Sequence, residues 1–339
     1  MQEEMISMIS LNRIAEKYPA ATDIHVTEGE CTEIRQWGEL RKLDEKAERD
    51  FFENLLLRLG DAEREHFKSC GSADGAFSLE SLRVRFHLYR TLGRYAAAFR
   101  LLPDLSQIGK DPDEEWLSRI AEQKSGLVLF TGPAGSGKST VLARVLLKIS
   151  RSRACHVITL ESPVEYIIPS EKALIHQREI GADALTFADG VRDALREDPD
   201  VLCIGELRDA ETMAAALTAA ETGHLVLGTL HTPHAKDAVA RIIHAFPAEK
   251  QSEARLLLAS VLRCCASQRL CRSGTNTYLI REIMTNIAPV AHLIRESKEE
   301  QIPSYMEMGM HSMRTMKGAV YALQNISDRE RERLLKSLD

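Results

Sequence analysis

The sequence has few aromatic residues and no excess of basic ones. Phe, Trp and Tyr make up 5% of its 339 residues, and 44 Lys and Arg face 50 Asp and Glu, for a formal net charge of -6. Proteins that bind nucleic acid through a broad surface usually carry a basic, aromatic-rich face. We therefore expect no nucleic-acid partner, and a DNA translocase ranks low among the candidate functions.

Long apolar segments are missing as well. No run approaches the ~20 residues that a helix needs to cross a bilayer, although 44% of the residues are hydrophobic. The N-terminal stretch MQEEMISMISLNRIAEKYPA is acidic and amphipathic, whereas a secretion signal would be basic and then apolar. We expect a cytoplasmic protein without membrane insertion, which does not prevent it from docking on a membrane-bound partner.

Cysteines at metal-ligand spacing are a third absence. The seven cysteines are scattered and none forms a C-x2-C pair, which predicts reduced thiols in the cytosol. Cys264, Cys265 and Cys271 come close together in a segment that has a helical pattern. Adjacent residues of a helix face different directions, so we expect no metal site there.

The length and the pattern of apolar residues predict two domains. Residues 1–102 contain strands at TDIHVTEG, SLRVRFHLYRTL and RYAAAFRLLP together with helical segments, and they read as a small α/β domain. Residues 103–113 carry Gly, Pro and Asp and read as a linker. In residues 114–339, strands of buried type alternate with helices, which predicts a mainly parallel sheet covered on both faces. Beyond residue 235 the pattern is mostly helical.

The stretch FTGPAGSGKST contains a complete G-x-x-x-x-G-K-[ST] phosphate loop between a predicted strand and a predicted helix. Its glycines let successive backbone N–H groups point at phosphate oxygens, and the helix N-terminus adds a favourable dipole. We expect Lys138 to reach the β and γ phosphates of ATP, and the hydroxyl of Ser139 to bind Mg2+. The expected ATP-binding residues are Gly132, Pro133, Ala134, Gly135, Ser136, Gly137, Lys138, Ser139 and Thr140.

A carboxylate follows the apolar strand DVLCIG. Glu206 would emerge at the carboxyl edge of a parallel sheet, where ligands bind in open α/β folds. This placement predicts that Glu206 supports the Mg2+ ion. Asp209 is better suited to capping the helix that follows.

The sequence resembles the secretion ATPases in four segments that stand in the family's order and spacing. They match its Walker A, Asp, Walker B and His boxes: GPAGSGKST, LESPVEY, ALREDPDVLCIGELRDAET and LTAAETGHLVLGTLHT. In detail they are similar to the PilT subgroup, the type IV pilus retraction motors, and the similarity continues in TDIHVTEG and VAHLIRESKEEQIPSYMEMG. The resemblance implies a PAS-like N-terminal domain, a RecA-like P-loop ATPase domain and a homo-hexamer with ATP near subunit interfaces.

The same resemblance implies roles for residues outside the phosphate loop. Glu165 would position the attacking water, and Glu206 falls on the family's Walker B glutamate. His224 and His231 match the family's paired histidines near the γ-phosphate.

Three arginines of the N-terminal domain complete the expected site. Arg83, Arg85 and Arg100 match family arginines that reach phosphate. An arginine supplied late to a phosphoryl-transfer site is worth ~10³ to 10⁵ in rate. If that arginine belongs to a separate domain, closing the domain and hydrolysing ATP become one event.

Departures from the family pattern keep alternative functions open. Ser162 stands where the Asp box commonly has Asp, and His292 replaces an Asn of the family's AIRNLIRE element. The favoured function is a hexameric motor for pilus retraction. The second is a pilus-extension or type II/IV secretion ATPase, many of which carry a C-x2-C pair. The third is a nucleotide-gated accessory subunit with little turnover, which Ser162 alone supports.

The resemblance also implies where the protein acts and with what. The expected partners are an inner-membrane pilus platform protein and, as a further candidate, a second pilus motor ATPase. Its expected location is therefore the cytoplasm, peripheral at the inner face of the cytoplasmic membrane.

Overall fold

The computed structural model describes residues 11–79, 82–103, 105–106, 108–273, 276–324 and 326–338. The chain divides into two compact units. The first comprises the chain up to Gly109 together with Ser162–Ile167 and Glu179–Leu185, and the second comprises the remainder. This division differs from the predicted boundaries in two respects. The second unit begins at Lys110, because Asp111 and Asp113 are buried within it, and two later loops group with the first unit.

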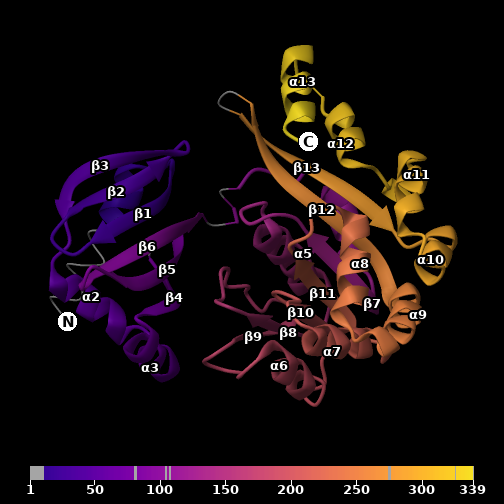
Figure 1. Ribbon diagram of the computed structural model, residues 1–339, viewed down its shortest axis with the longest axis horizontal. Helices are drawn as coiled ribbons and strands as arrows, with labels where there is room; N and C mark the ends of the chain where they lie inside the picture. The colour runs from indigo at the N-terminus through magenta and orange to yellow at the C-terminus, as the bar shows by residue number, and fades with distance from the viewer. Residues whose placement is uncertain are drawn as a thin grey trace. The chain divides into compact units, whose positions relative to one another are not determined.

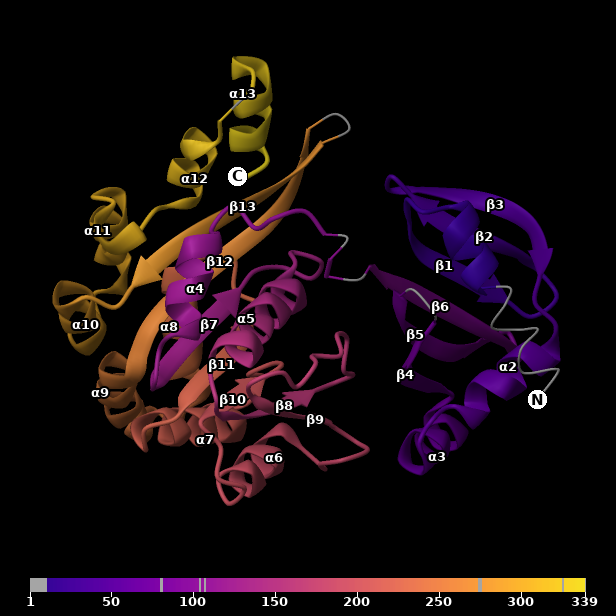
Figure 2. The ribbon, with the colours of Figure 1, turned by 180° about the vertical axis from the view of Figure 1, so that it is seen from behind.

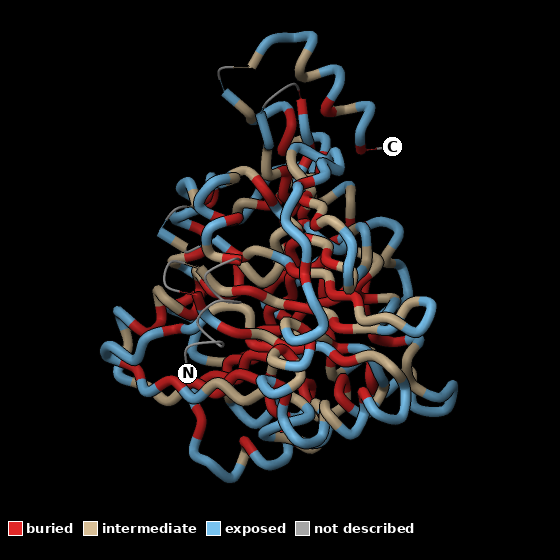
Figure 3. The backbone as a smooth tube through the Cα atoms, turned by 90° about the vertical axis from the view of Figure 1, so that its left-hand side faces the viewer, coloured by how far each residue is buried: buried red, intermediate tan, exposed pale blue. Residues whose placement is uncertain are grey.

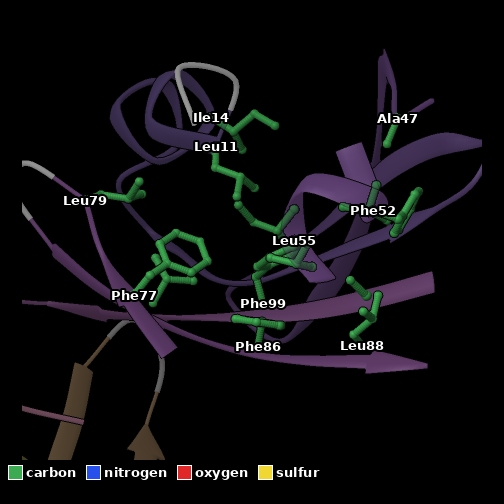
Figure 4. Close-up of a cluster of buried hydrophobic side chains, with 14 of the residues drawn as sticks. Leu11, Ile14, Ala47, Phe52, Leu55, Phe77, Leu79, Phe86, Leu88 and Phe99 are labelled. Atoms are coloured by element: carbon green, nitrogen blue, oxygen red, sulfur yellow. The ribbon is translucent and has the colours of Figure 1, made fainter. Parts of the chain in front are cut away.

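The first unit is built on a six-stranded antiparallel sheet in the order β3-β2-β1-β6-β5-β4. Its elements are β1 (Ala21–Thr27), β2 (Cys31–Gln36), β3 (Glu39–Lys46), α2 (Arg49–Leu57), α3 (Asp61–Cys70), β4 (Ser72–Ser78), β5 (Leu82–Thr91) and β6 (Arg94–Pro103). Alternation along β5 places apolar side chains on one face, and the register pairs Phe86 of that face with Phe99 on β6. There Phe52, Phe77, Phe86 and Phe99 form a core with surrounding leucines (Figure 4).

Two tight hairpins set the register of this sheet. The β2–β3 turn has Trp37 at φ +51 and Gly38 at φ +89, and the β5–β6 turn has Leu92 at φ +49 and Gly93 at φ +79. Two-residue turns with positive φ at both positions match the right-handed twist of the flanking strands. The β5–β6 turn therefore fixes which residues of these two strands stand opposite each other.

The second unit is built on a seven-stranded sheet in the order β13-β12-β7-β11-β10-β8-β9. Its strands are β7 (Gly126–Thr131), β8 (His156–Glu161), β9 (Leu174–Glu179), β10 (Val201–Ile204), β11 (Leu225–Leu230), β12 (Leu262–Ser273) and β13 (Asn276–Thr285). The five strands β12, β7, β11, β10 and β8 run parallel. Every residue of β7, β10 and β11 is buried. Figure 3 shows in red how buried segments run through the interior. The predicted α/β fold with a mainly parallel sheet is confirmed.

Helices cover both faces of this sheet (Figures 1 and 2). On one face α4 (Glu114–Ala121) packs on α5 (Lys138–Ser152), and the other face carries α6 (Phe187–Ala194), α7 (Ala210–Glu221), α8 (Ala235–Ala245) and α9 (Gln251–Val261). Right-handed crossovers explain the split, because the chain crosses from β7 to β8 in one direction and returns through β10 and β11 in the other. The direction of winding therefore changes between β7 and β11, which is where open α/β sheets bind ligands.

The chain beyond residue 235 departs from the predicted, mostly helical pattern. β12 and β13 form a long antiparallel hairpin that joins the sheet beside β7. The helices that follow are α10 (Ala288–Arg295), α11 (Ile302–Glu307), α12 (Met316–Ala322) and α13 (Asp328–Lys336), and Figure 1 shows α12 and α13 beside the hairpin. In the described part of the chain, no helix combines the length and the apolar character needed to cross a membrane.

The predicted helical setting of the three clustered cysteines is therefore wrong. Cys264, Cys265 and Cys271 lie on the strand β12, and all three are buried free thiols. Burial raises the pKa of Cys264 to about 12. At this position the thiol is a core side chain that stays protonated.

Candidate functional site

The phosphate loop connects the carboxyl end of β7 to the amino end of α5, the strand–loop–helix context that the motif requires. Gly132 has φ +138 and Gly137 has φ +87, in the region that favours glycine. A Cβ atom at Gly132 would lie 2.3 Å from the carbonyl oxygen of Gln268 on β12, so space also requires glycine here. Residues 133–135 are exposed, whereas Ser136 is buried. The loop therefore presents its tip to solvent while its base packs on β12.

Lys138 is the first residue of α5, and its ammonium group lies over the loop. Nζ donates to the carbonyl oxygens of Gly132 at 2.8 Å and Pro133 at 3.0 Å. It also lies 3.4 Å from Nδ1 of His231. The hydroxyl residues 139 and 140 follow, half-buried, in the first turn of α5. A cation and two hydroxyls thus meet at a helix N-terminus, whose partial positive charge favours anions.

Glu206 follows β10 at the same edge of the sheet. Its carboxylate lies 2.7 Å from Nη2 of Arg208 and 3.3 Å from Nε2 of His231. Burial alone would raise the pKa of Glu206, but the hydrogen bond and charge of Arg208, followed by those of His231, hold the pKa below its ordinary value. The carbonyl of Gly205 accepts a hydrogen bond from the hydroxyl of Thr229, which fixes the turn that leaves β10. Glu206 is therefore an ionised carboxylate at neutral pH, held in a defined position.

His231 stands at the carboxyl end of β11, between Lys138 and Glu206. Its Nδ1 faces the ammonium group and its Nε2 faces the carboxylate. An imidazole with a proton on Nε2 donates to the carboxylate, and its Nδ1 accepts from the ammonium group. Lys138, His231 and Glu206 come from different parts of the sequence and form one continuous row at the carboxyl edge.

The structure does not bring His224 to this row. His224 precedes β11, and its carbonyl accepts the N–H of Gly126 at the start of β7, so it lies at the amino edge of the sheet. Its Nδ1 is 3.1 Å from the hydroxyl of Thr222 and 3.0 Å from the carbonyl of Ala219, at the end of α7. The whole of β11 separates it from His231, roughly 20 Å of extended chain. Within one chain His224 lies at the end of α7, and its role near the γ-phosphate stays a prediction.

The two glutamates of LESPVEY are held in different ways. Glu161 ends β8, and its Oε1 accepts from a threonine hydroxyl on β8 at 2.6 Å and a glutamine amide on β9 at 3.0 Å. Glu165 belongs to the loop Ser162–Ile167, which groups with the first unit, and its Oε1 lies 3.4 Å from Nη1 of Arg85. Glu161 therefore shares the carboxyl edge with Glu206, and the water-positioning role of Glu165 stays a prediction.

The three arginines of the first unit share one face of its sheet. Arg83 and Arg85 are two residues apart on β5, and Arg85 stands directly opposite Arg100 on β6. Nε of Arg83 donates to the carbonyl of Val164 at 3.2 Å, and Nε of Arg100 donates to Asp23 at 2.9 Å. The other face of the two strands is the core. The three side chains are gathered and held by neighbours in their own unit, and their reach to phosphate stays a prediction.

Several residues around the site were not predicted from the sequence. Arg208 pairs with Glu206 and was not predicted to do so. Its position two residues after Glu206, in the same Walker B segment, was a signal that could have indicated this contact. His234 precedes α8, and its Nδ1 lies 3.5 Å from Oε2 of Glu282, an interaction that raises the pKa of His234. Glu282 and Gln268 lie on the β12–β13 hairpin. They were missed because this hairpin was itself not predicted.

Comparisons with known proteins cover most of the chain. The family described as type II/IV secretion system protein matches residues 89–332. The type IV pilus retraction ATPase PilT of Pseudomonas aeruginosa is 36% identical over 297 residues, which cover 85% of this chain and 86% of that protein. The uncharacterized protein YggR of Escherichia coli is 44% identical over 262 residues, covering 75% of this chain and 79% of YggR. A crystal structure of the pilus retraction motor PilT with bound ADP matches 96% of this chain and 95% of its own, with a TM-score of 0.81 and 35% identity.

Proposed function

Since the chain belongs to the family of type II/IV secretion system proteins and is a PilT-like ATPase, we propose that it is a hexameric motor that uses ATP hydrolysis to retract a type IV pilus. One observation carries the proposal: the similarity to pilus retraction ATPases spans both units of the chain. Secretion ATPases in general share the phosphate loop, so the loop alone would not choose among them. Similarity in the first unit as well supports the more specific function.

Hydrolysis in this proposal takes place at the carboxyl edge of the seven-stranded sheet. Lys138 exchanges its contacts with loop carbonyls for the β and γ phosphate oxygens. His231 lies within hydrogen-bonding distance of both Lys138 and Glu206, so it links the ammonium group to the carboxylate. Glu165 positions the attacking water, and Glu161 is the next carboxylate available at this edge.

The oxygen atoms of this edge fit a Mg2+ ion. Ser139 supplies a hydroxyl and Glu206 supplies an ionised carboxylate, and hard oxygen ligands are those that Mg2+ prefers. The lowered pKa of Glu206 keeps that ligand charged at neutral pH. When bound, Mg2+ neutralises charge on the phosphate oxygens.

The arginines of the first unit connect hydrolysis to movement in this proposal. Arg83, Arg85 and Arg100 act on ATP that is held partly by a neighbouring subunit of the ring. Because an arginine stabilises the transition state only when it is in place, hydrolysis then requires movement of its domain. The force would pass to an inner-membrane platform protein, alone or beside a second pilus motor ATPase, so the motor acts at the inner face of the cytoplasmic membrane.

Deleting the gene and counting surface pili tests the direction of force. Loss of a retraction motor leaves extended pili in place, so we expect more pili per cell and loss of twitching-type movement. Complementation with the wild-type gene should restore the normal number, and complementation with Lys138→Ala should not. Cells without pili would identify an extension motor and overturn the proposal.

Mixing two inactive variants tests the ring. Lys138→Ala and Arg85→Ala should each hydrolyse ATP poorly, yet a mixed ring contains interfaces with one intact loop and one intact arginine. We expect part of the activity to return. The matched control mixes Lys138→Ala with Glu206→Gln, whose defects lie in the same unit, so no interface becomes complete. Recovery in the control, or no recovery with Arg85→Ala in verified mixed hexamers, contradicts arginine supply between subunits.

A further inference from the structure

Gln268 contacts the phosphate loop from its buried side. Gln268 lies on β12 with 1% of its surface exposed, and its Nε2 donates to the carbonyl oxygen of Ser136 at 2.7 Å. The backbone of β12 is equally near, since a Cβ atom at Gly132 would lie 2.3 Å from the carbonyl oxygen of Gln268. Two separate points of the loop, Gly132 and Ser136, therefore rest on one residue of the hairpin.

The hydrogen bond to Ser136 fixes the direction of the next backbone N–H. In a trans peptide, the C=O of one residue and the N–H of the following residue point in opposite directions. With the carbonyl of Ser136 directed at Gln268, the N–H of Gly137 is directed away from β12. Backbone N–H groups of a phosphate loop are its donors to phosphate oxygens. Gln268 thus acts on one of these donors through a single shared peptide plane.

The side chain of Ser136 does not supply this support itself. Its hydroxyl oxygen is buried and, within the described residues, has no hydrogen-bond partner. The carbonyl of Ser136 is therefore held by the amide of Gln268 on β12, with no contribution from the side chain of Ser136.

Arg281 in turn orients the amide of Gln268. Nε of Arg281, on β13, donates to Oε1 of Gln268 at 3.1 Å. An amide has one acceptor oxygen and one donor nitrogen. Because the guanidinium engages the oxygen, the nitrogen faces Ser136, and rotation of the amide by half a turn would break both bonds.

Arg281 is held by two carboxylates at the start of the second unit. Its side chain is fully buried, with Nη1 2.7 Å and Nη2 2.9 Å from the two oxygens of Asp111, and Nη1 also 2.9 Å from Asp113. A bidentate pair fixes the plane of the guanidinium as well as its position. The guanidinium also lies over the ring of Trp116, 5.7 Å from its centre. Asp111 is the second residue of the unit, which begins at Lys110.

We propose that Asp111, Arg281 and Gln268 form a positioning relay, which sets the phosphate-binding geometry of the loop from the point where the chain enters the ATPase unit. None of the three touches nucleotide in this proposal. They act by holding the peptide between Ser136 and Gly137, so they change affinity for phosphate groups rather than the chemical step. The inference rests on the phosphate loop being the nucleotide site and is independent of the direction of pilus movement.

The variant Gln268→Met tests the relay in the full-length protein. Met has a similar length and no hydrogen-bonding amide, so the peptide at Ser136 loses its partner. The loss of one hydrogen bond predicts a rise of about 3- to 10-fold in the Kd for ADP, measured by titration calorimetry. The KM for ATP should rise by a similar factor while kcat changes little, because the lost interaction is equal in the ground and transition states.

Asn286→Leu is the matched control. Nδ2 of Asn286 donates to the carbonyls of Ala259 at 2.9 Å and Leu262 at 2.8 Å, so this variant also removes amide-to-carbonyl hydrogen bonds at the hairpin. We expect a lower melting temperature with an unchanged Kd for ADP. If Gln268→Met behaves in the same way, Gln268 is only a structural residue and the proposal is overturned.

Two further variants separate the possible failures. If Lys138→Ala binds ADP as tightly as the wild type, the nucleotide site lies elsewhere and the relay falls together with the site assignment. Asp111→Asn tests the far end of the relay, and Asp113 still pairs with Arg281 in that variant. We expect its Kd for ADP to rise about 2- to 3-fold. An unchanged Kd in Asp111→Asn removes Asp111 from the relay, whatever the result at Gln268.

Discussion

The two halves of the seven-stranded sheet contribute to the nucleotide site in different ways. The parallel strands β7, β10 and β11 lead to Lys138, Glu206 and His231, which are at least partly accessible to solvent. The antiparallel hairpin β12–β13 contributes Gln268 and Arg281, which are buried and hydrogen-bond to other protein groups. One half offers groups that a ligand reaches, and the other offers groups that hold the loop. Ligand chemistry and loop geometry are therefore separable within a single sheet.

This difference predicts two kinds of mutational effect. Changes at the ends of the parallel strands should lower kcat, because in the proposed function these groups face the reacting phosphate and its metal ion. Changes in the hairpin should raise KM or lower stability and leave the chemical step nearly intact. A variant at a strand end that changes only KM, or a hairpin variant that lowers kcat, would contradict this division.

Lys138→Ala should have the largest effect. The ammonium group lies 2.8 Å from the carbonyl oxygen of Gly132. In the proposed function it faces the β and γ phosphates, so the variant loses that charge. We expect turnover to fall by about 10³-fold, as when one electrostatic partner of a transition state is removed, together with weaker nucleotide binding. Phosphate release measures the effect. Lys148→Ala, on the same helix but paired with Glu114, is the control and should keep normal turnover.

Glu206→Gln should follow, with a fall of at least about 100-fold in kcat and nearly normal ATP binding. The amide keeps the shape of the side chain but loses the charge that its environment maintains through a lowered pKa. Comparison of ATP affinity with single-turnover rate separates the two effects. Glu211→Gln changes a carboxylate that is exposed and pairs with Arg192, so it should alter neither quantity. Wild-type turnover in Glu206→Gln would remove this residue from the catalytic edge.

Glu165→Gln tests a carboxylate outside both halves of the sheet, because Glu165 groups with the first unit. If it positions water as the family resemblance implies, kcat should fall by about 100-fold while ATP affinity stays within a few-fold of normal. Glu161→Gln is the companion variant, since Glu161 lies on the parallel edge itself. A larger loss in Glu161→Gln, with normal turnover in Glu165→Gln, would transfer the role to the sheet.

The parallel half of the sheet can be predicted from the sequence because its strands are continuous apolar runs that lead into motifs. The apolar run GLVLFT forms β7, and the glutamate of the Walker B segment follows β10 at the carboxyl edge. Asp209 caps α7 as expected, since its Oδ1 accepts the N–H of Thr212 at 2.8 Å. Local pattern and motif agree in this half, so the accessible groups are found without a structure.

The hairpin half cannot be predicted in the same way. Burial along β12 does not alternate, because much of the strand is covered on both faces. Arg281 lies in an otherwise mainly apolar strand, and its partner Asp111 lies 170 residues earlier in the chain. The segment around Asp111 has the composition of a linker. No local signal exists for a contact between two residues so far apart, so the relay emerges only from the fold.

The edge strand β3 of the first unit is difficult to predict for a different reason. β3 carries the sequence ELRKLDEK, and Leu43 is the one buried residue of the strand. An edge strand with charged side chains lacks the apolar alternation on which strand prediction depends. The central strand β5 alternates clearly, and the face that carries Arg83 and Arg85 can be read from it.

Asp111→Asn should have the smallest effect, mainly on stability, and its size should depend on pH. Burial alone would raise the pKa of Asp111, but the hydrogen bond and charge of Arg281 bring the pKa below its ordinary value of 3.8. The folded protein therefore binds this proton less readily than the unfolded chain. Stabilisation by the carboxylate is fully present above the unfolded pKa and is lost as pH falls through the lower, folded pKa.

Thermal unfolding from about pH 7 down to about pH 3 measures this dependence. At neutral pH the wild type should melt a few degrees above Asp111→Asn. This gap in melting temperature should narrow below about pH 4, because protonation of Asp111 makes the wild-type side chain uncharged, like the asparagine of the variant. Asp189→Asn changes an exposed carboxylate paired with Arg192, so its gap should stay near zero throughout. A gap for Asp111→Asn that stays constant to the lowest pH would mean that shape, rather than the charge of the carboxylate, holds Arg281. The hairpin half of the sheet would then support the phosphate loop by packing alone.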